Sequence, residues 1–381
     1  MTITVSAPCG RVVHRMRRPV AGVATRPDAG PHDPRTHPDA VPPAAPHPPA
    51  IRLNGPADLL AVIPYLLGFH PADSLVVVGL QDGRIGFCFR ADLADPPATE
   101  RIVAMLAAQS LTGVILAGYG PAERVEPVGD AVARALADAG QPVLDRLRTH
   151  GGRFWSAACH RADCCPPGGR PVPAPSRVAA EATLAGLVAL PTRDELAGQI
   201  APITGPDRVA MERATHRAEL RVQSLLDGAP SPAAAAERML TDGLAAVRDA
   251  ARRYRADPAA RLTDDEAAWL GVVLAATQVR DEAWLLAERD LAGARALWTD
   301  VMRRVTDEYL PAPAALTGFV CWQQGDGAVG MMALGRALAV DPSYSMALLL
   351  SQALAGGLPP AAWRPTAAGS SGAADEPGLG S

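Results

Sequence analysis

The sequence predicts a mixed α/β domain, in which helices cover a sheet, followed by an all-α domain. Two observations support this fold class. Apolar, β-branched runs alternate with helical patterns from residue 51 to about residue 200, as they do in layered α/β folds. Beyond that point the strand-like runs stop, and apolar residues recur at helical spacing as far as residue 364. We therefore place a mixed α/β domain at 51–200 and a helical domain at 201–364.

The α/β domain is organised around residues 75–80, a continuous apolar run rich in valine. A run of this kind is typical of a strand that is buried on both faces. A helix is predicted at 56–67, because the Asn-Gly-Pro sequence at 54–56 supplies signals for a helix start. The Asp-Gly pair at 82–83 predicts a tight hairpin, which returns the chain as an antiparallel strand at 84–90.

The remaining elements follow the same two patterns. In the α/β domain we predict further helices at 97–110, 128–139, 176–190 and 193–199, and further strands at 113–117, 142–148 and 153–158. In the helical domain we predict helices at 207–227, 231–255 and 263–277, one broken helix or two at 283–305, and two helices with part of a third at 314–356.

The two ends of the chain differ from the rest in composition. Residues 1–50 are rich in proline, arginine and histidine, and residues 365–381 are mostly glycine, serine and alanine with two acidic residues. Segments with so few apolar residues to bury do not form a core. We predict a disordered, mildly basic tail at 1–50 and a second disordered tail at 365–381.

The composition excludes several classes of protein. All 36 basic residues are arginine, so enzymes that require lysine, such as Schiff-base enzymes and P-loop nucleotide hydrolases, are excluded. The net charge of −4 argues against nucleic-acid binding, and no apolar run reaches the roughly 18 residues of a membrane span. Three scattered and three clustered cysteines do not form a secreted disulfide framework. We expect a reduced, cytoplasmic protein without a cofactor.

The loop at 159–169 carries the most reactive group of side chains. Its candidate metal ligands are Cys159, His160, Cys164 and Cys165. Zinc takes four such nitrogen and sulfur ligands in a tetrahedron. Neighbouring side chains of an extended segment point in opposite directions, however, so Cys164 and Cys165 cannot both reach one ion without a sharp turn. A redox or nucleophilic thiol is a further alternative. We expect a rigid, metal-free loop with partly buried thiols.

Two short polar turns lie at the ends of predicted strands. Their candidate ligand-binding residues are His70, Asp73, Ser74, Gly118 and Gly120. Turns at strand ends are where open α/β sheets often bind phosphates and substrates. The alternative is that Asp73 and Ser74 only bond the backbone of their own turn. Because the chain contains no G-x-S-x-G sequence of a serine hydrolase, we assign no catalytic residue.

Residues 325–330 read G-D-G-A-V-G, which matches the G-x-G-x-x-G pattern. A dinucleotide site needs a strand before this pattern and an acidic residue after the next strand, whereas the segment before it is helical and no strand follows. The wider pattern, W-x-x-G-D at 322–326 with Asp-Pro at 341–342, is similar to the helix-turn-helix of a tetratricopeptide unit. We therefore predict a tetratricopeptide-like hairpin, which must stack on other helices to bury its apolar face.

Seven stretches of the chain resemble the actinobacterial domain-of-unknown-function family 4192. They are N-G-P-A-D-L-L at 54–60, P-Y-L-L-G-F-H-P-A-D-S-L-V-V-V-G-L at 64–80, R-A-D-L at 90–93, C-C-P-P-G-G at 164–169, R-D-E-L at 193–196, W-Q-Q-G-D-G-A at 322–328 and R-A-L-A-V-D-P-S-Y-S-M-A at 336–347. The resemblance covers residues 51–364 and implies a bacterial source, but it implies no activity, cofactor or catalytic residue. Gly168 and Gly169 stand where that family usually has an acidic residue followed by glycine.

Two functions are compatible with these patterns. The first is a non-enzymatic, partner-binding or regulatory protein, which uses its helical domain to bind an unknown protein. The helical stack and the lack of a recognisable catalytic constellation favour it. The second is an enzyme or small-ligand-binding α/β domain, whose pocket lies at the strand ends near 70–74 and 118–120. That second function requires the two turns to lie together around a pocket.

Overall fold

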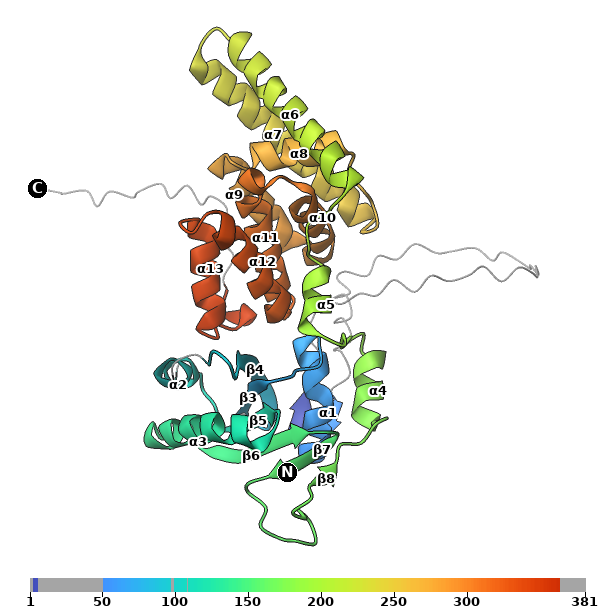
Figure 1. Cartoon of the computed structure of the whole chain (residues 1–381). Helices are drawn as coiled ribbons and strands as arrows, with labels where there is room; N and C mark the ends of the chain where they lie inside the picture. Colours follow the sequence, from blue (N-terminus) through green and yellow to red (C-terminus); the bar gives the residue numbers. More distant parts are fainter. Residues whose placement is uncertain (1–2, 6–50, 97–98, 108, 364–381) are drawn as a thin grey trace, which may run out of the picture.

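The computed structural model describes residues 3–5, 51–96, 99–107 and 109–363. Figure 1 shows a sheet with its helices at one end of the molecule and a group of helices at the other. The short helix α5 (Arg193–Gly198) lies between the two parts. The predicted order, a mixed α/β part followed by a helical part, is confirmed. The predicted tails lie outside the described residues, except for Ile3–Val5.

The α/β part is built on one mixed sheet of eight strands in the order β2-β1-β4-β3-β5-β6-β7-β8. The strands are β1 (Ile3–Val5), β2 (Ile51–Leu53), β3 (Ser74–Gln81), β4 (Arg84–Asp92), β5 (Gly113–Tyr119), β6 (Val143–His150), β7 (Arg153–Ser156) and β8 (Arg170–Pro171). β3 pairs antiparallel with both β4 and β5, and β5 pairs parallel with β6. The sequence analysis did not predict β1, β2 or β8; β1 pairs with β2 and β4, and β8 pairs with β7.

β3 is buried on both faces, as its apolar run predicts. Val76 and Val78 face the core that includes α1 (Pro56–Leu67), whereas Leu75 and Val77 face α2 (Thr99–Ala107) and α3 (Ala122–Asp138). All four side chains are at most 1% exposed. Full burial of one such side chain contributes about 1.5–3 kcal/mol. β3 therefore fixes the two layers of helices on opposite faces of the sheet.

Several helix boundaries differ from their predictions: α8 (Asp264–Val273) ends before residue 277, and the next helix begins at Thr277 rather than at 283. At two other boundaries, proline and glycine explain the difference. α3 begins at Ala122 rather than at residue 128, and Pro127 lies inside the helix, where a proline normally indicates a boundary. α4 (Arg177–Leu184) ends well before residue 190. Gly186 adopts a φ of 82°, the left-handed conformation that commonly closes a helix.

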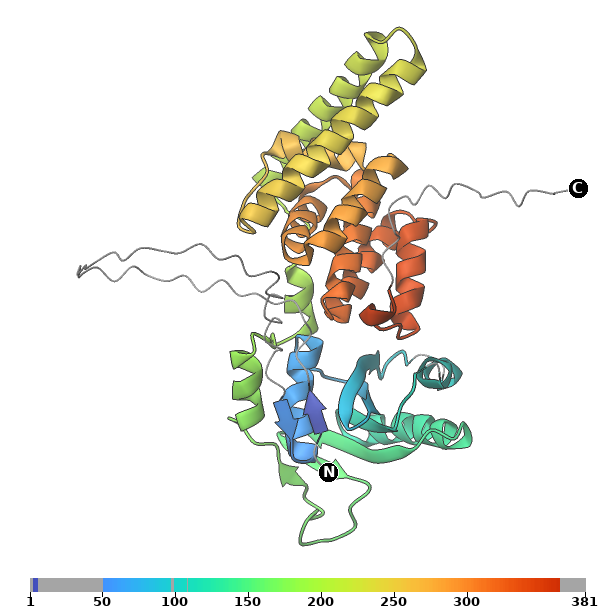
Figure 2. The ribbon, with the colours of Figure 1, turned by 180° about the vertical axis from the view of Figure 1, so that it is seen from behind.

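The helical part contains α6 (Pro206–Asp227), α7 (Pro232–Ala256), α8 (Asp264–Val273), α9 (Thr277–Arg289), α10 (Leu291–Arg304), α11 (Pro311–Gln323), α12 (Gly327–Val340) and α13 (Ser345–Ala355), with short 3₁₀ turns at Asp307–Tyr309 and Pro360–Ala362. The hairpin of α6 and α7 extends away at the end farthest from the sheet (Figures 1 and 2). Asp290 divides the predicted segment 283–305 into two helices, because its carboxylate accepts a hydrogen bond from the N–H of Gly293 and caps α10. None of the described helices is long and apolar enough to cross a bilayer.

Hydrogen bonds join the helical part to the segment that leads into it from the α/β part. Arg303 Nε donates to the carbonyl oxygen of Ala201 at 3.0 Å, and the N–H of Ile203 donates to the carbonyl oxygen of Arg303 at 2.9 Å. Near the other end of the chain, Gln109 Nε2 donates to the carbonyl oxygen of Gly357 at 2.7 Å. The helical part is thus bonded both to its own lead-in segment and, through Gln109, to the α/β part.

Candidate functional site

The two polar turns predicted at the strand ends lie side by side. Ser74 pairs with Tyr119 in the ladder between β3 and β5, so the segments that flank these residues meet at the same edge. A Cβ atom built on Gly120 would lie 3.4 Å from Asp73 Oδ1. The structure therefore brings Asp73 and Ser74 close to Gly118 and Gly120, as a shared ligand site requires.

The polar side chains of these turns are bonded within the fold. Asp73 Oδ1 accepts a hydrogen bond from Arg124 Nη1 at 2.8 Å. Ser74 Oγ, which is buried, accepts a hydrogen bond from Arg90 Nε at 2.8 Å. These contacts fix the turn against α3 and β4. They engage one carboxylate oxygen of Asp73 and the hydroxyl of Ser74 within the fold.

Gly118 packs against α3, and the backbone of His70 is bonded to the segment that follows α4. Val125 of α3 packs so closely against Gly118 that a Cβ atom there would overlap it. The His70 side chain is exposed, and its backbone N–H donates to the carbonyl oxygen of Leu190 at 2.9 Å. A cavity of about 250 Å³ lies between α3 and the hairpin of β6 and β7. It is lined by residues such as Trp155, and by none of the five candidates.

The cysteine loop, which connects β7 to β8, brings three thiols together. The Sγ atoms of Cys159, Cys164 and Cys165 all lie within 4.8 Å of one another. The N–H groups of Cys164 and Cys165 both donate to the carbonyl oxygen of Arg161, at 3.1 and 2.6 Å. This tight turn contradicts the expectation that two adjacent cysteines would point apart. His160 is exposed and is not part of the thiol group.

The three thiols also change one another's ionisation. A hydrogen bond from the Cys165 thiol, together with one from the backbone N–H of Arg161, lowers the pKa of Cys159. The same contact with Cys159 raises the pKa of Cys165 to about 12. Arg170 Nη1 lies 3.9 Å from the Sγ atom of Cys164. Negative charge on this group of thiols is thus favoured first at Cys159.

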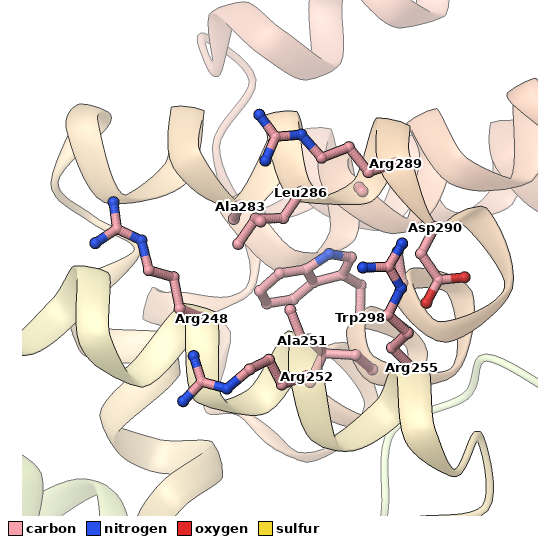
Figure 3. A pocket seen from close by; sticks show the side chains of 12 residues that line it. Arg248, Ala251, Arg252, Arg255, Ala283, Leu286, Arg289, Asp290 and Trp298 are labelled. Carbon is pink, nitrogen blue, oxygen red and sulfur yellow. The ribbon is translucent and has the colours of Figure 1, made fainter.

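The helical part contains a pocket that the sequence analysis did not identify (Figure 3). This cavity of about 170 Å³ lies between α7, α9 and α10. Its apolar lining includes Ala283, Leu286, Ala287, Leu297 and Trp298. The Trp298 ring lies at the centre of Figure 3, although this residue is only 1% exposed. Four arginines surround this apolar floor, namely Arg248, Arg252, Arg255 and Arg289.

Two of the four arginines form ion pairs next to the pocket. Arg248 Nε lies 2.8 Å from Glu282 Oε1, and Arg252 pairs with Asp249 on its own helix. The positions of Arg248, Arg252 and Arg255 follow the i, i+4, i+7 spacing of one face of α7, which is visible in the sequence. That spacing alone does not distinguish a pocket rim from a solvated face, because the floor comes from α9 and α10.

The other two arginines are not neutralised in the same way. Among the described residues, neither Arg255 nor Arg289 forms an ion pair. Asp290, the one acidic residue that lines the pocket, accepts a hydrogen bond from the N–H of Gly293 at 3.2 Å. Its carboxylate caps α10 and keeps its negative charge, so four arginines and one carboxylate line the pocket. The rim of the pocket carries net positive charge around an apolar floor.

Comparison with known protein families identifies the chain. The family described as Domain of unknown function (DUF4192) matches residues 56–361 of the 381 residues. The chain belongs to this family. No curated protein and no solved structure matches the chain. The DUF4192 region includes the strand-end turns, the cysteine loop and the arginine-rimmed pocket, and the family assigns no function to any of them.

The G-x-G-x-x-G stretch of this DUF4192 protein forms the turn between two packed helices. Gly325 adopts a φ of 76° in the turn, and Asp326 caps α12 by accepting a hydrogen bond from the N–H of Val329. A Cβ atom on Gly330 would lie 3.1 Å from the carbonyl oxygen of Gly318 on α11. The glycines therefore permit a turn and a close helix contact, and the predicted helical hairpin is confirmed. Its likeness to a tetratricopeptide unit stays a prediction.

Proposed function

We propose that this protein is a non-enzymatic, partner-binding protein whose helical domain binds an acidic protein segment in the arginine-rimmed pocket. The observation that carries the proposal is an excess of arginine over acidic side chains around an apolar floor. Arg255 and Arg289 have no ion-pair partner among the described residues. A carboxylate from a partner would neutralise them, and complementary charge of this kind favours association with the correct partner.

The size of the pocket favours a single side chain over a whole metabolite. Sites for small molecules generally measure about 300–1,000 Å³, whereas this cavity measures about 170 Å³. The partly exposed Ala251 and Leu286 offer the apolar contact surface, and the buried Leu297 and Trp298, each 1% exposed, support it from below. We therefore expect the partner segment to insert one aliphatic side chain, flanked by aspartate or glutamate residues that meet the arginines.

The alternative of an enzyme or small-ligand site at the strand ends has weaker support. The two turns do lie together, but Asp73 and Ser74 are bonded to Arg124 and Arg90. The cavity beside α3 is lined by other residues. We favour partner binding because its candidate site has both a cavity and charged groups directed to its rim.

A fluorescein-labelled acidic peptide with one central leucine is a direct probe of the pocket. Fluorescence anisotropy with the full-length protein is expected to show saturable binding that weakens as salt is added. Replacing the central leucine by serine should weaken binding at least about fivefold, because the side chain would no longer bury apolar surface. Equal binding of the leucine and serine peptides would refute the proposed anchor.

Charge-matched variants separate the pocket from general electrostatic attraction. The double variant Arg255→Glu/Arg289→Glu should weaken binding of the leucine peptide at least about tenfold. Arg213→Glu/Arg238→Glu changes the net charge equally at two exposed positions that do not line the pocket. It should change the affinity less than about twofold. Equal losses in both double variants, or no binding by the unmodified protein, would contradict the proposal.

A further inference from the structure

The three clustered thiols already lie near the spacing of metal ligands. Zinc–sulfur bonds of about 2.3 Å in a tetrahedron place the sulfur atoms roughly 3.8 Å apart. The Sγ atoms of Cys159, Cys164 and Cys165 all lie within 4.8 Å of one another. A contraction of about 1 Å or less, within reach of side-chain rotation, therefore converts the group into three ligands of one ion.

The backbone turn explains how two adjacent cysteines join the same group. The carbonyl oxygen of Arg161 accepts hydrogen bonds from the N–H groups of both Cys164 and Cys165. The chain thus curls like one turn of a helix at 161–165, and the two thiols no longer alternate as in an extended strand. This removes one reason for which a metal-free loop was expected, the opposed directions of two adjacent cysteines; a fourth sulfur ligand is still absent among the described residues.

The fold holds both ends of the loop in place. At its start, the N–H of Ala158 donates to Asp145 Oδ1 of β6 at 3.1 Å. At its end, Trp155 Nε1 donates to the carbonyl oxygen of Pro167 at 2.9 Å, and Arg153 donates to the carbonyl oxygens of Gly168 and Gly169. The ligands are therefore brought together by contacts that do not depend on a metal, which lowers the cost of binding one.

We infer that Cys159, Cys164 and Cys165 form a zinc-binding site with three thiolate ligands and a fourth position open to solvent. Thiolates select soft or borderline ions such as zinc. Three thiolates with Zn²⁺ leave a net charge of about −1, and Arg170 Nη1, 3.9 Å from the Sγ atom of Cys164, is placed to offset it. Cys164 is exposed, so an ion can reach the group.

The fourth position of the site is open because His160, the nearest further candidate ligand in the sequence, lies outside the group of thiols. Its imidazole is exposed and lies outside the group of convergent ligand atoms, although it is the neighbour of Cys159 in sequence. Structural zinc sites are closed by four protein ligands, whereas sites with three protein ligands bind water or an external ligand. The site is independent of the proposed partner-binding pocket, which lies in the helical part.

Metal analysis of the full-length protein tests this inference. Protein purified under reducing conditions without added metal should contain about one zinc per chain, and cobalt should replace it with the charge-transfer and d–d absorption of a tetrahedral thiolate site. Cys164→Ser should abolish the thiolate absorption and lower the zinc content to less than about 0.3 per chain. Cys88→Ser, the same change at a cysteine of β4 outside the group, should retain both.

Three results would overturn the inference. The first is zinc below about 0.3 per chain in the unmodified protein together with no cobalt spectrum. The second is a disulfide between two of the three cysteines in protein isolated without reductant, which would indicate a redox pair. The third is loss of zinc in His160→Ala, since the fourth position would then be a protein ligand. Retention of zinc by His160→Ala supports the open site, and circular dichroism verifies that each variant is folded.

Discussion

Asp326 Oδ2 accepts a hydrogen bond from Arg295 Nη2 at 2.6 Å, which joins the turn between α11 and α12 to α10. The two side chains are only 11% and 25% exposed. Asp326 is the second residue of the G-x-G-x-x-G stretch, and it also caps α12. Asp326 therefore lies in a stretch that matches a dinucleotide-binding pattern, but its side chain stabilises the contact between α10, α11 and α12.

We predict that Asp326→Asn destabilises the protein by about 2 kcal/mol, because it leaves the largely buried guanidinium of Arg295 without its anionic partner. Asparagine keeps an oxygen that can cap α12, so the loss reports the ion pair. Urea unfolding followed by circular dichroism measures the change. The control Asp265→Asn breaks an exposed pair with Arg217 and should cost less than about 1 kcal/mol. Equal losses in the two variants would disprove the special role of Asp326.

Two glycines of α12 should respond in opposite directions to alanine. At Gly330 a Cβ atom would lie 3.1 Å from the carbonyl oxygen of Gly318, so α11 and α12 must separate, at a cost of about 1–3 kcal/mol. At Gly335 nothing lies within 4 Å of the new atom. Gly335→Ala should therefore stabilise the protein by about 0.5–1 kcal/mol through helix propensity. Thermal unfolding of both variants tests the pair, and stabilisation by Gly330→Ala would contradict the close contact.

Much of the fold could be predicted from local sequence signals. The apolar run at 75–80 predicts the central strand, and α1 and α5 begin and end within one residue of their predictions. The errors lie where tertiary context outweighs the local signal. Pro127 is accommodated inside α3, and β1 depends on pairing with β2 and β4, so neither has a readable local pattern.

The candidate sites were harder to predict because each one depends on contacts between residues far apart in the sequence, or on a turn without a repeating sequence pattern. Gly120 and Asp73 lie next to each other because β3 pairs with β5. Only the hypothesis of an enzyme or small-ligand site required these two turns to be neighbours. Cys164 and Cys165 converge because the chain turns at Arg161, and the sequence of that segment contains no clear signal for this turn. The arginine-rimmed pocket combines a spacing on α7 with a floor from α9 and α10.

Arg304 is the most deeply buried charged residue among those described, at 2% exposure. Its guanidinium donates to Asp264 Oδ1 at 2.5 Å, to Asp300 Oδ2 at 3.1 Å and to the carbonyl oxygen of Leu262 at 2.9 Å. We predict that Arg304→Met destabilises the protein by about 3 kcal/mol, since three acceptors lose their donor. Urea unfolding measures it, with Arg217→Met at an exposed pair as the control. A loss below about 1 kcal/mol would show that the acceptors regain water freely.

The capping box of α8 should make stability depend on pH in the acid range. Hydrogen bonding to Arg253, followed by hydrogen bonds from Thr263, lowers the pKa of Glu266 from its usual 4.5 to about 2, although partial burial opposes the shift. Because the folded state holds the lower pKa, the charged carboxylate contributes stability above pH 4.5, and that contribution is lost as the pH falls toward 2. Glu266→Gln should therefore be less stable than the unmodified protein near neutral pH, and the difference should shrink below pH 4.5. Urea unfolding from about pH 7 to about pH 3 measures it, and a difference that stays constant over this range would show that the charge of Glu266 does not stabilise the helix start.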